Sequence, residues 1–200
     1  SLVPMTGFRI SPNPTMVETM PESYMGMGLT AERVAAEWNV NRADQDEFAY
    51  QSHKKAAAAY DSGKFKGEIT PITFDEVTMS ANGKPEKTTI TFDTDEHLRR
   101  ETTVDGLAKL KPVFKEGGTV TAGNSSPLSD GAAALLIMEG SMAAKLGLKP
   151  LARFVGFAAS GVRPEVMGVG PIKALPKLLQ RTGVALQDID LFELNEAFAA

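Results

Sequence analysis

Cysteine is absent from all 200 residues, and its absence excludes several kinds of site. Without cysteine the chain can form no disulfide framework, no thiolate metal site and no cysteine nucleophile of its own. The two histidines, His53 and His97, are far apart in the sequence. Because zinc and iron sites usually need several clustered ligands, we expect no metal site.

Positive charge and long apolar runs are also scarce. The chain has 21 Lys and Arg against 25 Asp and Glu, a formal net charge of −4. No basic stripe is present, so we expect no nucleic-acid partner. The longest apolar run, residues 132–138, is far shorter than the roughly 20 residues of a membrane-spanning helix, so we expect no membrane span. The 42% hydrophobic and 23% charged residues are typical of a globular protein.

Helical patterns occur in both halves of the chain. Thr30 and Asn41 are suitable N-caps for helices over residues 30–38 and 41–60, and residues 61–63 are a typical C-terminal stop. Apolar spacing and a starting proline predict a helix over residues 171–181. Shorter helices are expected over residues 95–100, 104–110 and 141–146.

Strand patterns are of two kinds. Residues 68–74 and 88–92 alternate and are β-branched, with a turn over residues 82–85, so they predict a β-excursion. Residues 119–122 predict a short strand, while residues 132–138, 151–159 and 189–194 have the apolar pattern of strands in a layered sheet. The alternation of strands and helices from residue 130 onward predicts an α/β fold.

The ends of the chain suggest an internal segment of a longer protein. The sequence begins without Met and without a signal or transit peptide pattern. It stops within about one turn of the helix expected after residues 189–194, and a helix that short is not stable alone. We therefore expect that both ends are cut.

Asn195 is the first candidate for chemistry. It follows the expected strand 189–194, and open α/β sheets bind ligands beyond the carboxyl ends of their strands. In the alternative interpretation, Asn195 caps the next helix and Phe198 fills the core. The hexapeptide over residues 195–200 does not decide between the two.

A series of motifs, in order along nearly the whole chain, resembles the thiolase family, enzymes that join or split acyl-CoA at a 3-ketoacyl thioester. The motifs occupy residues 27–32 (MGLTAE), 44–49, 63–69, 95–99, 107–112, 118–126 (GTVTAGNSS), 129–134, 167–171 and 195–199 (NEAFA). The resemblance implies an incomplete thiolase-type layered αβαβα fold with a mixed helical and β loop domain. It also implies three parts: the loop domain in residues 1–129, the last strand and helix of the N-terminal half in residues 130–149, and the start of the C-terminal half in residues 150–200.

The resemblance also implies roles for particular residues. Asn195 matches the asparagine that holds a water in the family's oxyanion hole, which stabilises the charge on a thioester or enolate oxygen. The positions that match CoA contacts in the family are Met27, Arg99, Ala122, Ser126, Leu128, Met167, Ala197 and Phe198. Without the family match, the two methionines would be read as core and Arg99 as a solvated surface residue. Many relatives have a histidine where this chain has Gly26, a departure at the mouth of the expected tunnel.

Three residues of the family's mechanism have no match in this chain. Thiolases use a nucleophilic cysteine upstream of these motifs, and a histidine and a second cysteine downstream. His53 and His97 do not match the missing histidine, and we expect both on the surface. The resemblance therefore implies a competent full-length enzyme, whereas the fragment alone is predicted to be inactive.

The implied function is that of an acetyl-CoA C-acyltransferase: thiolytic cleavage of 3-ketoacyl-CoA in fatty-acid β-oxidation. The segments 2–24 and 99–103 favour this degradative branch. The alternatives are an acetyl-CoA acetyltransferase, a non-catalytic CoA-binding module and, more weakly, a ketoacyl synthase relative. The expected partners are acyl-CoA and CoA, with CoA as substrate and no cofactor. We further expect a homo-oligomer for the full-length enzyme and a cytoplasmic location, although the missing N-terminus leaves an organellar signal open.

Overall fold

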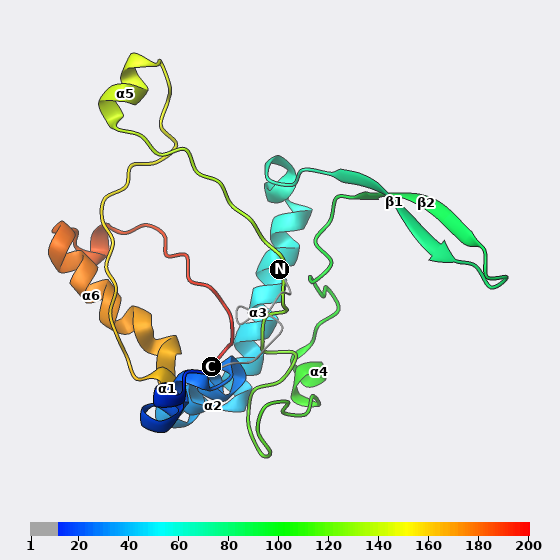
Figure 1. The fold of residues 1–200 in the computed structure, drawn as a ribbon, viewed down its shortest axis with the longest axis horizontal. Coiled ribbons are helices and arrows are strands. Elements are labelled where there is room, and N and C mark those ends of the chain that lie inside the picture. Colours follow the sequence, from blue (N-terminus) through cyan, green and yellow to red (C-terminus); the bar gives the residue numbers. More distant parts are fainter. Residues whose placement is uncertain (1–11) are drawn as a thin grey trace.

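The computed structural model describes residues 12–200 and contains short helices, one long helix and a single hairpin (Figure 1). The segment 2–24, which favoured the degradative branch, lies partly outside the described residues. The α-helices are α1 (Pro14–Thr19), α2 (Met27–Glu37), α3 (Arg42–Asp61), α4 (Val104–Ala108), α5 (Gly140–Lys145) and α6 (Gly170–Thr182). Four 3₁₀ helices, η1 (Pro21–Tyr24), η2 (Lys64–Gly67), η3 (Pro164–Val169) and η4 (Leu186–Asp188), and strands β1 (Ile72–Met79) and β2 (Pro85–Phe92) complete the set.

Helix α3 forms where its end signals predict it. The Asn41 side chain accepts a hydrogen bond from the backbone N–H of Asp44 at 2.9 Å, which satisfies one of the free donors of the first turn. After the helix, Gly63 adopts the left-handed conformation with a φ of 72°. A left-handed residue at this position ends the helix, and glycine has no Cβ to oppose it.

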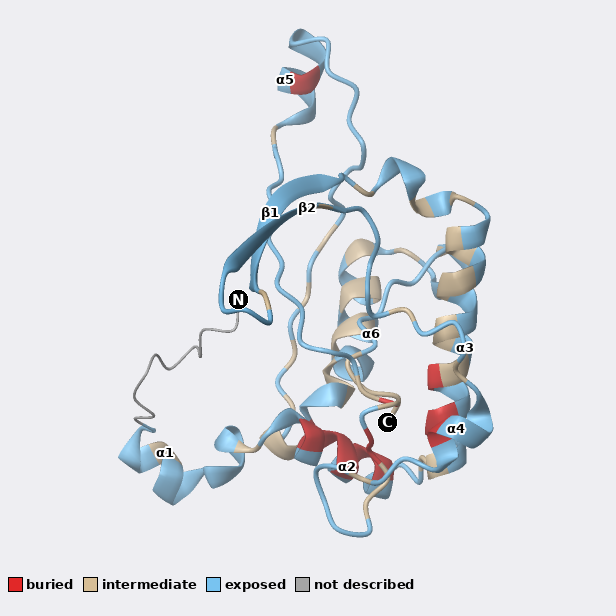
Figure 2. Cartoon of the chain, turned by 90° about the vertical axis from the view of Figure 1, so that its right-hand side faces the viewer, coloured by how far each residue is buried: buried red, intermediate tan, exposed pale blue. Residues whose placement is uncertain are grey.

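Helix α2 begins three residues earlier than its apolar pattern predicts, at Met27 instead of Thr30. The Thr30 hydroxyl does not accept a capping bond but donates to the Met27 carbonyl at 2.6 Å, within the first turn. The core lies along this helix: Ala31, Val34 and Ala35 are buried where α2 packs on η3. Figure 2 shows the buried residues concentrated in α2 and in the first part of α3.

The expected β-excursion is confirmed as a hairpin that projects away from α3 (Figure 1). Strands β1 and β2 pair in antiparallel register, with Ile72 opposite Phe92 and Phe74 opposite Ile90. The connecting turn contains Gly83 at a φ of 72°, and its N–H donates to the Ser80 carbonyl at 2.9 Å. The strands differ in their bounds from the prediction: β1 covers residues 72–79 instead of 68–74 and β2 covers residues 85–92 instead of 88–92, so both reach the turn over residues 80–84.

The helices expected over residues 104–110, 141–146 and 171–181 are confirmed as α4, α5 and α6. The helix expected over residues 95–100 is wrong. Two backbone N–H groups of this segment bond to side chains of α3: Asp95 N–H to the Tyr60 hydroxyl and Arg99 N–H to Nδ1 of His53. These contacts to α3 replace the hydrogen bonds that would have formed a helix.

The strands expected over residues 119–122, 132–138, 151–159 and 189–194 are also wrong for the described residues. A strand needs a hydrogen-bonded neighbour, and the sheet described within residues 12–200 consists of β1 and β2 alone. Residues 132–138 and 151–159 form extended arms around α5, with Leu136 84% and Phe154 80% exposed. The described fold is therefore mixed α and β with a partial sheet, and the three-part division of the chain stays a prediction.

No helix within residues 12–200 has the length and apolar character needed to cross a membrane.

Candidate functional site

A groove of about 990 Å³ runs along one side of α3. We call it the α3 groove; its walls are α3 from Phe48 to Tyr60 and parts of residues 95–110, 113–127 and 195–199. Four of the predicted site residues line it: Arg99, Ala122, Ser126 and Asn195. A smaller hollow of about 510 Å³, which includes Phe198, shares Phe48 and Asn195 with the groove. Residues almost 100 positions apart in the sequence thus meet on one surface.

Four predicted CoA contacts line neither the groove nor the smaller hollow: Met27, Leu128, Met167 and Ala197. Met27 is the first residue of α2 and Met167 lies in η3, and the two elements pack on each other. Both methionines are about half exposed, at 46% and 48%, so neither is a core residue. Leu128 is 85% exposed beyond the end of the groove.

The segment 195–199 is held against the loop 119–127 by backbone contacts. Ser126 N–H donates to the Ala197 carbonyl at 2.9 Å, and Ala199 N–H donates to the Asn124 carbonyl at 3.0 Å. An edge-to-face contact between the rings of Phe198 and Phe114 adds to them, with ring centres 6.0 Å apart. Residues 195–200 form no helix, and Asn195 is exposed on the groove wall.

The loop 119–127 is itself fixed by a buried carboxylate. Glu32 of α2, only 6% exposed, accepts hydrogen bonds from the backbone N–H groups of Thr119 and Val120, each at 2.8 Å. These charge-assisted hydrogen bonds stabilise the buried negative charge of Glu32 and at the same time give the backbone N–H groups of the loop an acceptor. Gly118 is needed beside it, since a Cβ there would overlap the Glu32 carboxylate.

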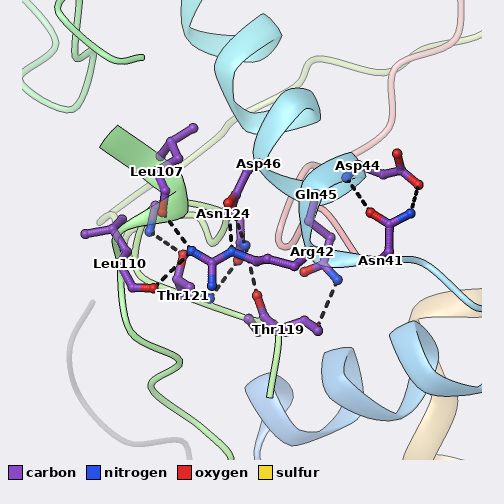
Figure 3. Close-up of polar contacts among 12 residues, drawn as sticks. Asn41, Arg42, Asp44, Gln45, Asp46, Leu107, Leu110, Thr119, Thr121 and Asn124 are labelled. Atoms are coloured by element: carbon purple, nitrogen blue, oxygen red, sulfur yellow. Dashed lines mark hydrogen bonds and ion pairs between the residues drawn. The ribbon is translucent and has the colours of Figure 1, made fainter. Parts of the chain in front are cut away.

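A second set of polar contacts joins the loop to α3 (Figure 3). Asp46, 1% exposed, pairs with Nε of Arg42 at 2.7 Å and accepts from Nδ2 of Asn124 at 3.0 Å. Arg42 also donates to the Leu107 and Leu110 carbonyls, and thereby holds the C-terminal end of α4. Figure 3 shows these side chains converging between α3 and the loop.

The supporting roles of Glu32, Asp46 and Asn124 are not evident from the sequence, although all three lie within the motifs. The sequence pattern carried no signal for them, because a charged or amide residue outside the apolar spacing is expected to be exposed. In the structure they support the groove and do not line it, apart from Asn124.

His53 lies on the α3 wall of the groove and is partly exposed, so it is at the surface as expected but half-buried. Its Nδ1 accepts the backbone N–H of Arg99 at 3.3 Å. Burial, and then the positive charge of Arg99, hold the pKa of His53 below its ordinary value of 6.5. His53 is therefore neutral near pH 7. His97 also lines the groove and is exposed, as expected.

Tyr60 holds the start of the loop that carries Arg99, residues 93–103. Its hydroxyl donates to Oδ2 of Asp95 at 2.7 Å and accepts from the Asp95 N–H. The hydrogen bond to the Asp95 carboxylate raises the pKa of Tyr60. Arg100 pairs with Asp61 at 2.8 Å, so the loop is attached to α3 at three points.

The α3 groove suits an elongated ligand with an apolar arm and a few polar groups. Its walls offer small and apolar side chains such as Ala56, Leu107 and Phe114, with the Ser126 hydroxyl and the Asn195 amide as polar partners. Among residues 12–200, no cluster of three or more His, Asp or Glu side chains could hold a metal ion.

Known proteins match the chain over nearly its whole length. The family described as "Thiolase, N-terminal domain" matches residues 11–141, and "Thiolase, C-terminal domain" matches residues 148–200. The 3-ketoacyl-CoA thiolase of Bacillus subtilis is 51% identical over 200 residues, which are 100% of this chain and 51% of that protein.

Two solved structures have the same fold. The Bacillus anthracis acetyl-CoA acetyltransferase matches with a TM-score of 0.80 and 41% identity, over 96% of this chain and 48% of that one. The dimeric peroxisomal thiolase of Saccharomyces cerevisiae matches with a TM-score of 0.81 and 40% identity, over 98% of this chain and 47% of that one. The chain spans about half the length of these proteins.

The order of motifs, the two matching domains and the shared α/β fold agree with one another, and the chain belongs to the thiolase family.

Proposed function

We propose that the chain is part of a thiolase that cleaves 3-ketoacyl-CoA with a second CoA, giving acetyl-CoA and a shortened acyl-CoA in fatty-acid β-oxidation. One observation carries this proposal: Asn195 lies on the same groove as Arg99, Ala122 and Ser126. An oxyanion-stabilising amide and a channel for an acyl-CoA arm are thus joined in one site. The B. subtilis relative is named a 3-ketoacyl-CoA thiolase, which agrees with the degradative direction.

The reaction needs a charge stabiliser and a thiolate. A thiolate adds to the 3-keto carbon, the C2–C3 bond breaks, and acetyl-CoA leaves as an enolate that takes up a proton. The second CoA then accepts the acyl group from the enzyme thioester and releases the enzyme thiolate, and the proton of its thiol replaces the one that the enolate took up. Asn195 stabilises the enolate oxygen through a bound water, a role that amide donors fill well in sites sheltered from bulk water. The chain contains no cysteine, so the thiolate comes from outside these 200 residues.

The binding roles follow from the positions of the residues on the groove. The Ser126 hydroxyl bonds an amide of the pantetheine arm, Ala122 leaves room for it, and Arg99 faces the nucleotide end. Met27, Leu128, Met167 and Ala197 would contact CoA only in a larger assembly, while Phe198 shapes the wall beside Asn195. CoA is a substrate in this scheme, and no cofactor is required.

We propose a homo-oligomer for the complete enzyme, in line with the dimeric S. cerevisiae thiolase. We propose a cytoplasmic location for the complete enzyme. The S. cerevisiae thiolase, by contrast, is named peroxisomal.

The test is thiolysis by the product of the complete coding sequence that contains this chain. Loss of the enolate absorbance of a 3-ketoacyl-CoA upon addition of CoA measures the reaction. Asn195→Ala should lower kcat by about 10²-fold, the loss usual for one oxyanion donor. Asn82→Ala, in the exposed hairpin turn, is the matched control and should keep full activity. Equal rates for both variants would refute the role of Asn195.

An acetyl-CoA acetyltransferase is the second candidate, because the B. anthracis structure carries that name. It shares the mechanism and differs in the length of the acyl chain. A series of 3-ketoacyl-CoA substrates of increasing length separates the two: acetoacetyl-CoA alone would be cleaved well by the acetyltransferase. A complete protein that binds CoA without any turnover would instead be a non-catalytic CoA-binding module.

A further inference from the structure

Consecutive residues of α3 hold the two segments that carry Asn195 and Arg99. The Ser52 hydroxyl donates to Oε2 of Glu196 at 2.5 Å, beside Asn195. The next residue, His53, accepts the backbone N–H of Arg99 at 3.3 Å. These are the contacts of α3 nearest to the two functional side chains. One turn of this helix thus sets the spacing between the catalytic amide and the arginine at the other wall.

The contact at His53 differs from the other two that hold the loop 93–103. Asp61 binds the Arg100 side chain, and Tyr60 binds both the carboxylate and the backbone N–H of Asp95, so neither of them contacts Arg99. His53 binds the backbone of Arg99 itself, from a half-buried position on the groove wall. It therefore controls where the Arg99 side chain leaves the backbone.

We propose that His53 is a positioning residue: in its neutral form it anchors the backbone of Arg99 on α3 and presents the Arg99 side chain to the acyl-CoA that occupies the groove. This inference rests on the proposed function. In it, His53 acts through Arg99 and does not touch the reacting atoms of the substrate.

The anchor depends on the protonation state of His53. Nδ1 can accept the Arg99 N–H only while it carries no proton. Once protonated, Nδ1 becomes a donor that faces another donor, and the imidazolium also faces the Arg99 guanidinium. The anchor is therefore lost as the pH falls.

Charges from every neighbouring element bear on this equilibrium. The loop contributes Arg99, with Arg100, His97 and Asp95 close by in the sequence, and α3 contributes Lys54 and Lys55 beside His53. Glu196, on the C-terminal segment, contributes a negative charge that is hydrogen-bonded to Ser52, the neighbour of His53. Burial and, after it, the positive charge of Arg99 lower the pKa of His53 and favour its neutral form.

Two substitutions separate positioning from packing. His53→Asn places Oδ1 where Nδ1 was, so it keeps the acceptor but cannot titrate, whereas His53→Ala removes the acceptor. At pH 8 we expect His53→Ala to raise the KM for CoA about fivefold, with kcat nearly unchanged, since one hydrogen bond is lost. His53→Asn should restore most of the wild-type KM.

The pH profile is the readout that a purely structural role would not change. In the wild type, the KM for CoA should rise as the pH falls from 7.5 to 5.5, and in His53→Asn this rise should disappear. His97→Asn removes the other histidine of the groove and is the matched control, which should keep the wild-type profile. The proposal is overturned if His53→Asn retains that profile or if His97→Asn abolishes it.

Amide hydrogen exchange of residues 93–103 tests the anchor without relying on enzyme activity. At pH 7.5 exchange should be faster in His53→Ala than in the wild type or in His53→Asn, whether or not the protein is active. Faster exchange in a protein that neither cleaves 3-ketoacyl-CoA nor binds CoA would refute the proposed function and leave the loop anchor intact. Unchanged exchange in His53→Ala would overturn the anchor itself.

Discussion

The side-chain amide of Asn124 donates to the buried carboxylate of Asp46 at 3.0 Å, across 78 positions of sequence. The same asparagine accepts the Ala199 N–H through its backbone carbonyl and the Thr121 N–H through its side chain. Asn124 thus connects the first turn of α3 to the segment that carries Asn195. A change in the buried pair should therefore affect both stability and the groove.

Asp46→Ala should destabilise the protein by about 2 kcal/mol, because it removes the buried carboxylate that accepts from both the Arg42 guanidinium and the Asn124 amide, although each keeps a backbone carbonyl as acceptor. Denaturant unfolding of the purified protein measures the loss. The matched control is Asp75→Ala, which removes the exposed ion pair with Lys87 on the hairpin and should cost far less. Equal losses for both variants would show that the buried contacts of Asp46 add no more stability than an exposed ion pair.

Glu32→Gln should loosen the loop 119–127, because an amide oxygen accepts less strongly than a carboxylate and an NH₂ group in place of Oε2 can no longer accept the second bond from the Thr119 N–H. Amide exchange at residues 119 and 120 should accelerate. Glu37→Gln, five residues along α2, removes only an exposed pair with Arg163 and serves as the control. Exchange that is equally slow in both variants would contradict a capping role for Glu32.

Ser52→Ala should release Glu196 and lower kcat about threefold to tenfold, since the loss of one hydrogen bond to a charged group lets Asn195 leave its productive position. The KM for CoA should change little, as Arg99 is anchored separately by His53. Ser141→Ala on the exposed helix α5 is the control. A rise in KM without a change in kcat would show that Ser52 acts on binding and not on Asn195.

The stability of the fold should also respond to pH through His53. Its pKa is lowered in the folded state, so the unfolded chain binds more protons in the window below the ordinary value of 6.5. Stability should thus be fully present above about pH 7 and decline as the pH falls below 6.5. His53→Asn should flatten this part of the profile, measured as the unfolding midpoint between pH 7.5 and 5.5. An unchanged slope would assign the dependence to other groups.

The sequence predicted the helices better than the strands, and the reason is physical. A helix closes its hydrogen bonds within itself, so local signals such as Asn41 and Gly63 define α3 almost to the residue. A buried strand needs neighbours that local patterns do not supply, and residues 132–138 and 151–159 have no such neighbour among the described residues. The expected helix over residues 95–100 was lost to side chains of α3, 46 positions away in the case of His53.

The sequence predicted those site residues that belong to a recognisable motif and also line the groove, such as Ser126 and Asn195. The supporting residues were not, because a periodic pattern treats a charged residue as exposed. Glu32 and Asp46 are buried only because distant donors reach them: the Thr119 and Val120 N–H groups in one case and Asn124 in the other. Such partners become visible only once the chain is folded.

The glycine at position 28 offers a test of how Asn195 is held that leaves every polar contact in place. A Cβ at Gly28 would overlap the Phe114 ring, whose edge contacts the ring of Phe198 at 6.0 Å between centres. Gly28→Ala should turn Phe114 toward solvent and remove that ring contact, worth about 1 kcal/mol. The gain in helix propensity, also about 1 kcal/mol, offsets the loss, so the free energy of unfolding should stay nearly constant.

Activity, by contrast, should fall in Gly28→Ala, because Phe198 and the neighbouring Asn195 lose one of their fixed points. Gly26→Ala is the matched control: Gly26 precedes α2 with a φ of −66°, and a Cβ there meets nothing within 4 Å. It should change neither stability nor kcat. A loss of kcat in Gly28→Ala at unchanged stability and unchanged KM for CoA would show that the Phe114–Phe198 contact positions the amide, because Phe114 also lines the groove and the loss of a direct contact with CoA would raise the KM. Full activity in Gly28→Ala would instead show that the backbone bonds from Ser126 and Ala199 are sufficient to hold the segment.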